Sequence, residues 1–221
     1  LGRTRWTWEI LLCDDGSRDQ TRQIFQNLAE QSSSRRFFFR AVYCGRGKNV
    51  SDGFRESRGR IVGFADADAS TAACYLLPVV QALESGYEVA EAHRNYKINI
   101  FDLPFIADRY AAHLGYAFLV QTLLGIRGHD TETGFKFFRR DAALKLLGET
   151  RSHGWFWDTE MIANAHALGY RVAEIPSLFI RTKGMPSTVK LARDSVSQLT
   201  SLLAFVRERK LKTLIGECCA R

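Results

Sequence analysis

Short apolar runs alternate with longer segments of helical periodicity along most of the chain. Ile10, Leu11 and Leu12 form one such run, which fits a strand buried on both faces. Further strands are expected at residues 37–44, 60–65, 86–94 and 171–177, and helices at residues 18–29, 104–124 and from 187 onward. Strands that alternate with helices predict an α/β fold with an open sheet.

Two aspartates, Asp66 and Asp68, follow the apolar run at residues 60–65. If this run is a strand, residues two apart lie on one face, so both carboxylates point to the same spot. Two like charges held that close repel unless a cation lies between them. Mg²⁺ or Mn²⁺ fits, because these ions prefer carboxylate oxygens and keep positions open for phosphate. An isolated Asp-x-Asp can also be a solvated strand end, so the choice between this and a metal site depends on the other segments of the chain.

The first expected strand also ends in carboxylates, Asp14 and Asp15. Gly16 permits a tight exit, and Ser17 with Gln20 has the form of a capping box, so a helix is expected to begin at Ser17. In open α/β sheets, ligands bind beyond the carboxyl ends of the strands. The two acidic strand ends therefore predict one ligand site, although Asp14 and Asp15 could also merely terminate a strand.

A glycine-rich, basic segment runs from Gly45 to Gly53 and is expected to form a turn. Its backbone amides, together with Arg46 and Lys48, could meet phosphate. The segment matches neither a P-loop nor a dinucleotide-binding fingerprint. The alternative is a turn followed by a solvated, basic helix start.

Composition narrows the class of protein. With 221 residues, 46% hydrophobic and 25% charged, the chain can fold as one sizeable domain. No stretch has the uninterrupted apolar length of a membrane span. Five cysteines without a Cys-x-x-Cys pattern indicate a reducing, cytoplasmic compartment. The five histidines show no metal-ligand spacing and are expected to be structural or surface residues.

The net charge of +7 suits nucleic acid, an anionic membrane or phosphorylated small molecules. Nucleic acid is the weakest of these, because the basic residues are scattered and no nucleic-acid-binding signature is present. One local cluster, residues 207–212, mixes cations with apolar side chains near the C-terminus. It predicts peripheral binding at the cytoplasmic face of a membrane.

Taken in order, these segments resemble glycosyltransferase family 2, and within it the polyprenyl-phosphate sugar transferases typified by dolichyl-phosphate mannose and glucose synthases. The most specific segment is Asp130-Thr-Glu-Thr-Gly-Phe-Lys136. The other matching positions are Asp14–Ser17, Gly45–Gly47, Gly53, Arg58–Gly59, Asp66–Asp68, Arg94, Trp157–Glu160 and Ser187. The resemblance covers nearly the whole chain, residues 1–221, as a single glycosyltransferase domain.

The resemblance implies a GT-A fold with a central, mostly parallel sheet flanked by helices. It implies a UDP- or GDP-sugar donor, a Mg²⁺ or Mn²⁺ ion, and a polyprenyl (dolichyl-type) phosphate acceptor. Carried over by position, the expected donor-binding residues are Asp14, Asp15, Gly45, Arg46 and Asp66; the metal ligands are Asp66, Asp68 and Ser70; and the catalytic residues are Asp66, Asp68, Arg94 and Arg109. Arg94 and Arg109 would meet donor or acceptor phosphate, and Arg94 is expected to be dispensable for packing.

The chain departs from the family pattern at three places. The family begins with a strand that ends in a Pro-x-Tyr-Asn-Glu-like loop, so the chain is expected to lack that first strand. Ser70 stands where many members have a glutamine that ligates the metal, and Arg46 stands where a lysine is usual. These departures bear on donor identity and metal affinity.

The expected reaction is a single displacement at the anomeric carbon with inversion. A phosphate monoester is already anionic near pH 7, so no strong general base is needed, and the metal stabilises the diphosphate leaving group. Candidate contacts for the acceptor's apolar tail are Phe105, Tyr110, Tyr116, Phe118 and the C-terminal helix, although most of these aromatics could equally be core residues.

Two rival functions stay open. In a haloacid-dehalogenase-type phosphohydrolase, Asp66 would be the nucleophile and Asp68 the acid/base, but the required downstream Gly-Asp-x-x-x-Asp is missing. Alternatively, the chain is an inactive or truncated relative that serves as a membrane-surface binding module.

Overall fold

The computed structural model describes residues 5–96, 103–126, 128, 130–179 and 191–219. Within these ranges, the side chains of residues 96, 103–109, 191–192 and 212–219 are outside the description. The strands are β1 (Ile10–Asp15), β2 (Arg35–Arg40), β3 (Ile61–Ala65), β4 (Val89–Tyr96), β5 (Phe135–Arg139) and β6 (Val172–Phe179). The helices are α1 (Thr21–Glu30), α2 (Arg46–Glu56), the short 3-10 helix η1 (Ala73–Tyr75), α3 (Leu76–Glu84), α4 (Leu103–Leu124), α5 (Arg140–Glu149), α6 (Trp157–Ala167) and α7 (Leu191–Cys219).

The strands form a parallel pair and a mixed sheet. β1 pairs with β2 in parallel, and the second sheet has the order β3–β5–β4–β6. β5 runs antiparallel to both neighbours, whereas β4 and β6 are parallel. The α/β class is confirmed, but the described strands are more mixed than the expected mostly parallel sheet. The reason is that β5 begins where β3 ends, with Phe135 opposite Ala65, so β5 has to run back along β3.

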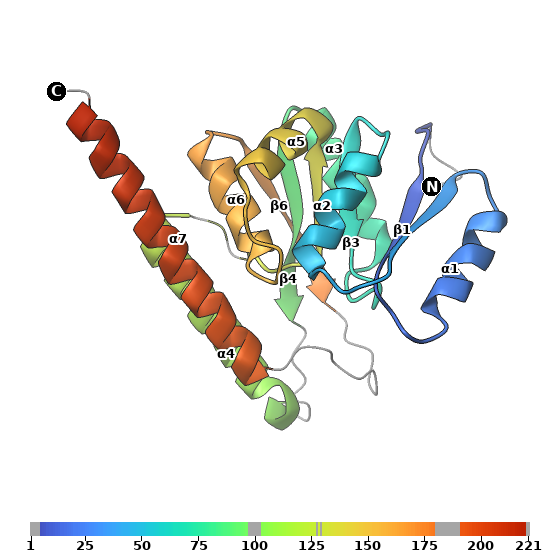
Figure 1. The fold of residues 1–221 in the computed structure, drawn as a ribbon, viewed down its shortest axis with the longest axis horizontal. Helices are drawn as coiled ribbons and strands as arrows, with labels where there is room; N and C mark the ends of the chain where they lie inside the picture. The colour runs from blue at the N-terminus through green and yellow to red at the C-terminus, as the bar shows by residue number, and fades with distance from the viewer. Residues whose placement is uncertain (1–4, 97–102, 127, 129, 180–190, 220–221) are drawn as a thin grey trace.

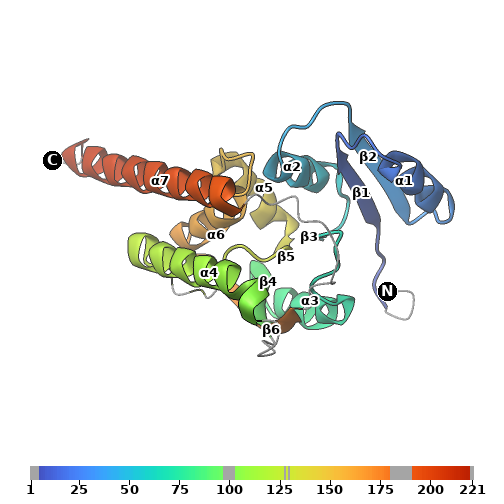
Figure 2. The same ribbon diagram turned by 90° about the horizontal axis from the view of Figure 1, so that it is seen from below.

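Helices cover both faces of the mixed sheet (Figures 1 and 2). On one face α3 packs on the sheet through Val79 and Leu83, against Ala90, Ala92 and Phe135. The larger core on the other face joins α2, α5 and α6 to the sheet and includes Phe54, Val62, Val89, Phe138, Leu146, Trp157 and Ile162. Val89 and Ala90 lie in different cores because neighbouring strand residues point to opposite faces.

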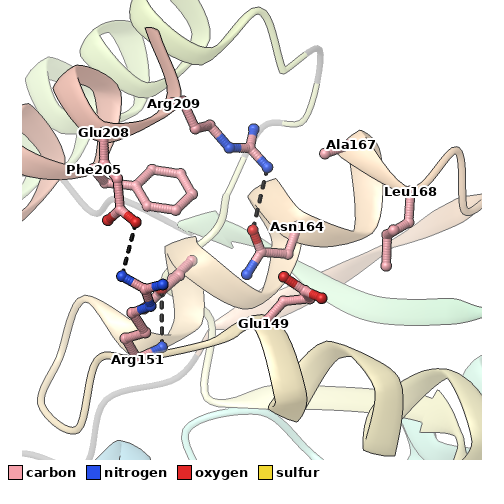
Figure 3. A pocket seen from close by; sticks show the side chains of 9 residues that line it. Glu149, Arg151, Asn164, Ala167, Leu168, Phe205, Glu208 and Arg209 are labelled. Atoms are coloured by element: carbon pink, nitrogen blue, oxygen red, sulfur yellow. Dashed lines mark hydrogen bonds and ion pairs between the residues drawn. The ribbon is translucent and has the colours of Figure 1, made fainter. Parts of the chain in front are cut away.

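Helices α4 and α7 run side by side at one end of the molecule (Figures 1 and 2). Leu202 and Val206 of α7 are buried in the larger core. Polar contacts of Glu208 and Arg209 add to this anchor beside a cavity of about 270 Å³ (Figure 3). Arg209 donates to the Ala163 carbonyl at 3.1 Å and to the Asn164 side chain at 3.2 Å, and Glu208 pairs with Arg151 at 2.8 Å. Arg209, expected to belong to a membrane-facing basic cluster, instead fixes α7 to α6.

The expected start of the first helix was wrong. Helix α1 begins at Thr21, not Ser17, and its N-terminal amide bonds to the Asp19 carboxylate at 3.0 Å. Ser17 instead donates its backbone N–H to Asp14 Oδ2 at 3.1 Å, and its hydroxyl also bonds to Asp14. Because both the backbone N–H and the hydroxyl of Ser17 bond to the Asp14 carboxylate, Ser17 is not available to cap α1, and the loop after β1 is closed by these bonds.

The expected glycine-rich turn is mostly helix, because α2 begins at Arg46. Gly45 supplies the turn with a φ of 103°, where a Cβ would lie 2.5 Å from the His153 carbonyl oxygen. Gly47 lies against Trp157, and a Cβ there would be 2.4 Å from the Trp157 Cβ. These glycines therefore allow α2 to pack closely rather than making the segment a loop.

None of the described helices combines the length and the apolar character needed to cross a membrane.

Candidate active site

Asp14 and Asp15 hold the loops at the carboxyl end of β1. The Asp14 carboxylate is buried and receives both bonds from Ser17. Asp15 accepts the backbone N–H groups of Cys44 and Gly45, each at 2.9 Å. Asp15 therefore fixes the start of α2, and with it Arg46, relative to β1.

Asp66 lies directly after β3 and packs against the segment 130–134. Its backbone N–H donates to the Gly134 carbonyl at 2.8 Å, and its Oδ1 accepts from Arg46 Nη2 at 2.9 Å. A Cβ at position 134 would lie 1.8 Å from Asp66 Oδ2, so only glycine fits there. The Asp66 side chain is still 40% exposed. Burial raises the pKa of Asp66, and the charge of Arg46 opposes this rise.

Asp68 and Ser70 lie in the loop that follows. Asp68 is exposed, and its Oδ1 accepts the Ser70 backbone N–H at 3.0 Å. Ala69 between them has a φ of 52°, a conformation that costs a residue with a Cβ about 1 kcal/mol. Ser70, the third expected metal ligand, is buried. The Asp68 charge raises the pKa of Asp66.

Strand alternation does not place the Asp66 and Asp68 carboxylates on one face, as was expected, because β3 ends at Ala65 and both aspartates follow it. Among the His, Cys, Asp and Glu side chains that the structure describes, none completes a three-ligand group with these two aspartates. At this edge the described part of the chain offers a metal two carboxylates at most.

Behind Asp66 lies a buried set of charges, here called the Arg46 network: Arg46, Asp66, Asp158, Lys136 and Glu91. Arg46 bonds to both Asp66 and Asp158 through its two terminal nitrogens. Lys136 is fully buried, with its Nζ 3.4 Å from Asp158 Oδ1 and 3.5 Å from Glu91 Oε2. The sequence predicted that Arg46 meets the donor phosphate, with a solvated, basic helix start as the alternative, and gave no sign of these buried partners.

The charges of the Arg46 network balance if Glu91 is neutral. Burial raises the pKa of Glu91 to about 8, with Lys136 opposing and the charges of Asp130 and Glu174 adding to the rise. Two cations, Arg46 and Lys136, then face two anions, Asp66 and Asp158. A balanced buried set costs far less than one with an unpaired charge.

Arg94 lies at the carboxyl end of β4 in a second polar cluster. Its Nε is 2.5 Å from Asp130 Oδ2 and its Nη2 is 2.7 Å from Asp130 Oδ1. Burial alone would raise the pKa of Asp130, but the Arg94 charge brings it down to about 2. The side chain of Asp130 is 0% exposed. The expectation that Arg94 is dispensable for packing is therefore wrong, because it neutralises a buried carboxylate.

Two residues of this cluster were missed. His113 Nδ1 is 3.2 Å from Arg94 Nη2 and 3.3 Å from Glu132 Oε2. His113, Asp130 and Glu132 lie close enough together to hold a cation, but the Arg94 guanidinium already lies among them. Glu132 stands in the most specific sequence segment, which could have marked it. Nothing in the sequence pairs it with a histidine 19 positions earlier.

A cavity of about 370 Å³ opens beside this cluster. His93, Arg94 and Asn95 line it from β4, and α4 contributes both polar and apolar side chains, including Tyr110, Leu114 and Phe118. Phe118 is 66% exposed. The cavity therefore joins a charged end to an apolar helix face. Tyr116, in contrast, belongs to the core side of α4, where its hydroxyl lies 2.9 Å from the Thr159 hydroxyl.

Three expected residues lie outside the described parts. Arg109 is in α4, but its side chain is not among those described, and the same holds for Phe105. Ser187 falls in the undescribed segment 180–190.

Comparison with solved structures identifies the fold. Glucosyl-3-phosphoglycerate synthase from Mycobacterium tuberculosis, in complex with Mn²⁺ and uridine-diphosphate-glucose, matches with a TM-score of 0.61 and 18% identity. The match covers 88% of this chain and 67% of that one. At such identity the likeness concerns the fold alone, which is the expected GT-A fold.

Comparison with curated proteins identifies the family. The chain is 32% identical over 170 residues to glycosyltransferase AglD of Haloferax volcanii, covering 76% of this chain and 27% of that protein. It is 30% identical over 191 residues to a dolichyl-phosphate beta-glucosyltransferase of Homo sapiens, covering 77% and 55% respectively. The chain thus spans about half the length of these relatives, or less. The family model for glycosyl transferase family 2 matches residues 2–147, which contain the acidic ends of β1 and β3 and the segment 130–136, and the chain belongs to that family.

Proposed function

We propose that the chain is the catalytic domain of a glycosyltransferase that moves glucose from a nucleotide-diphosphate sugar to a dolichyl-type polyprenyl phosphate. The observation that carries the proposal is Asp66, held by Arg46 and Gly134 at the carboxyl end of β3 with Asp68 two positions on. Relatives named dolichyl-phosphate beta-glucosyltransferases support the acceptor and the sugar. A fold neighbour solved with UDP-glucose and Mn²⁺ supports a UDP-sugar.

The donor would bind along the edge formed by β1, β3 and the start of α2. Asp14 and Asp15 would contact the base and ribose, and Gly45 and Arg46 would border the diphosphate. Asp66 and Asp68 fit a Mg²⁺ or Mn²⁺ ion, because both offer carboxylate oxygens at a partly exposed position. Such an ion, when bound, stabilises the negative charge of the leaving diphosphate.

The acceptor would bind in the cavity between β4 and α4. Its phosphate would lie toward Arg94 and His113, and its apolar tail along Leu114 and Phe118. The Arg94 charge is balanced by Asp130, so we expect Arg94 to act as a placed hydrogen-bond donor rather than as excess positive charge. Arg109, in the same helix, is proposed as a second phosphate contact.

The test is sugar transfer by the purified chain, measured with UDP-glucose or GDP-mannose, dolichyl phosphate, and Mn²⁺, Mg²⁺ or a chelator. We expect glucosyl transfer from UDP-glucose that falls at least about 100-fold in chelator and in Asp68→Asn. Asp141→Asn is the matched control, because this carboxylate is 72% exposed and lies on α5. Folded protein that binds vesicles without turnover would support a binding module instead, and phosphate release from a phosphomonoester would support a phosphohydrolase.

We also propose that α4 and α7 approach an anionic membrane surface. Exposed apolar side chains occur on both helices, namely Leu114 and Phe118 on α4 and Val196, Leu199, Leu203 and Leu211 on α7. The cations Arg207 and Lys210 lie on the same α7. Each cation near an anionic surface contributes about 1 kcal/mol, and salt screens this attraction.

The expected result is salt-sensitive binding to phosphatidylserine vesicles, weakened roughly 30-fold by Arg207→Gln with Lys210→Gln, since two charges contribute about 2 kcal/mol. Vesicle sedimentation at low and high salt measures it. The control pair, Arg139→Gln with Lys145→Gln, removes the same charge from β5 and α5. Truncation after Phe205 is a poor test, because it also removes the anchors Glu208 and Arg209. Equal binding by both pairs would contradict the proposal.

A further inference from the structure

The geometry of one guanidinium links Asp66 to the protein interior. Arg46 Nη2 lies 2.9 Å from Asp66 Oδ1, while its Nη1 bonds to Asp158 Oδ2. Because the guanidinium is planar and rigid, the position of one carboxylate restricts the position of the other. The rings of Phe64 and Trp155, with centroids 5.0 and 5.4 Å from the Arg46 Cζ, limit its movement further.

Arg46 and Asp158 lie at the starts of two helices, α2 and α6, that contact each other. Arg46 is the first residue of α2, whose Lys48 backbone N–H donates to the His153 carbonyl at 3.1 Å. Asp158 lies in the first turn of α6 and is 2% exposed. Gly47 lets α2 touch Trp157, the residue before Asp158. The spacing between Arg46 and Asp158 is thereby fixed by backbone packing rather than by the ion pair alone.

Lys136 is fully buried and donates to the Thr133 carbonyl at 2.5 Å, a bond that an apolar side chain could not make. Burying an ammonium group is costly unless a nearby charge compensates, and methionine has a similar length without the charge. Lys136 does compensate a charge, since its Nζ is 3.4 Å from Asp158 Oδ1, an atom with no hydrogen-bond partner among the described residues. Without this cation, the unbalanced Asp158 would attract Arg46 more strongly and compete with Asp66 for it.

We propose that Lys136 and Asp158 are positioning residues for the donor site: through Arg46 they set the direction of the Asp66 carboxylate. The inference rests on the proposed function, in which Asp66 meets the metal and the donor. Neither Lys136 nor Asp158 reaches the surface, so neither touches a substrate. Their effect should appear in the binding of the metal and donor and not in that of the acceptor.

The test compares steady-state kinetics of the wild type with those of Lys136→Met and Asp158→Asn. Each single variant is expected to raise the KM for UDP-glucose and the Mn²⁺ concentration at half-maximal rate at least tenfold. The KM for dolichyl phosphate should stay within twofold. The double variant removes one cation and one anion, so charge balance returns, and the amide oxygen introduced by Asp158→Asn can still accept from Arg46. It should recover most of the donor affinity.

Glu91→Gln is the matched control, because Glu91 touches Lys136 but not Arg46. It is expected to change the thermal midpoint while leaving the KM for UDP-glucose within twofold. Wild-type donor KM and metal dependence in folded Lys136→Met would overturn the inference and leave the proposed function standing. A lower kcat in both single variants, with the KM values for UDP-glucose and dolichyl phosphate as in the wild type, would also overturn it.

Failure of the proposed function would look different, since the wild type itself would then transfer no sugar. In that case, calorimetry of Mn²⁺ with UDP still tests the inference. A tenfold weaker affinity in Lys136→Met, restored in the double variant, would support it. Equal affinity in all variants would refute it.

Discussion

Gly134→Ala is expected to lower the kcat/KM of sugar transfer by about 100-fold or more while the protein stays folded. The new Cβ would lie 1.8 Å from Asp66 Oδ2 and 2.2 Å from its Cγ, so the carboxylate has to move. The backbone cannot separate easily, because Asp66 N–H and the Gly134 carbonyl share a 2.8 Å bond. A displacement of about 1 Å at a catalytic group costs on the order of 100-fold in rate. Initial rates with UDP-glucose and dolichyl phosphate measure the effect.

Gly148→Ala provides the matched control. Gly148 lies in α5 with no atom within 4 Å of an added Cβ, and its φ is not in the positive range. We expect full activity and equal or slightly higher stability, since alanine is the better helix residue. Combined with Asp66→Ala, Gly134→Ala should add little further loss, because both changes act on one carboxylate. Gly134→Ala activity within threefold of wild type would show that Asp66 is not the sensitive group.

Arg94→Met is expected to lower the free energy of unfolding by about 3–5 kcal/mol at pH 7, because it leaves the buried Asp130 carboxylate without its cation. Asp130→Asn in the same chain should restore much of this loss, since it removes the unpaired charge. Urea denaturation of the single and double variants gives the coupling. Arg139→Met is the control: its partner Asp141 is 72% exposed, and such surface pairs contribute less than about 1 kcal/mol.

The same ion pair gives the pH dependence a definite sign. The folded-state pKa of Asp130 is about 2, below its ordinary value of 3.8. The stabilisation is therefore complete above about pH 4 and is lost as the pH falls toward 2. In Arg94→Met the lone carboxylate gains a proton more readily, so the difference from wild type should shrink between pH 7 and pH 3. A difference that is constant over this range would argue against a buried, charged Asp130.

Local sequence patterns predicted every described strand except β5, and they placed carboxylates at the ends of β1 and β3. Apolar runs located β1 and β3, and the carboxylates at the ends of these runs do lie at or just after strand ends. The segment 130–136 was recognised as the most specific, and the structure gives a reason: Asp130 holds Arg94, Gly134 makes room for Asp66, and Lys136 enters the Arg46 network. Each of these roles depends on a residue type that few substitutes could fill.

Partners far apart in the chain could not be predicted. Arg46 and Asp158 are 112 positions apart, and no spacing rule joins them. Strand β5 was not predicted, since Lys136 interrupts its run of phenylalanines and Arg139 ends it, and its antiparallel direction depends on its pairing with β3. The start of α1 was misplaced because Ser17 bonds to the Asp14 carboxylate instead of capping the helix. A capping rule that considers only the residues of the helix start cannot include this bond. Whether Asp14, Asp15, Ser70 and Arg109 contact ligands stays a prediction.

A metal site with only two protein carboxylates, Asp66 and Asp68, has a thermodynamic consequence. A divalent cation there would take further oxygen ligands from water and from the donor diphosphate, because no described His, Cys, Asp or Glu side chain completes a three-ligand group with the two aspartates. Metal and nucleotide would then each raise the affinity of the other, and linkage requires both factors to be equal. Neither would be retained well alone. Departure of the nucleoside diphosphate would therefore also loosen the ion, and each catalytic cycle would exchange both with the surrounding solution.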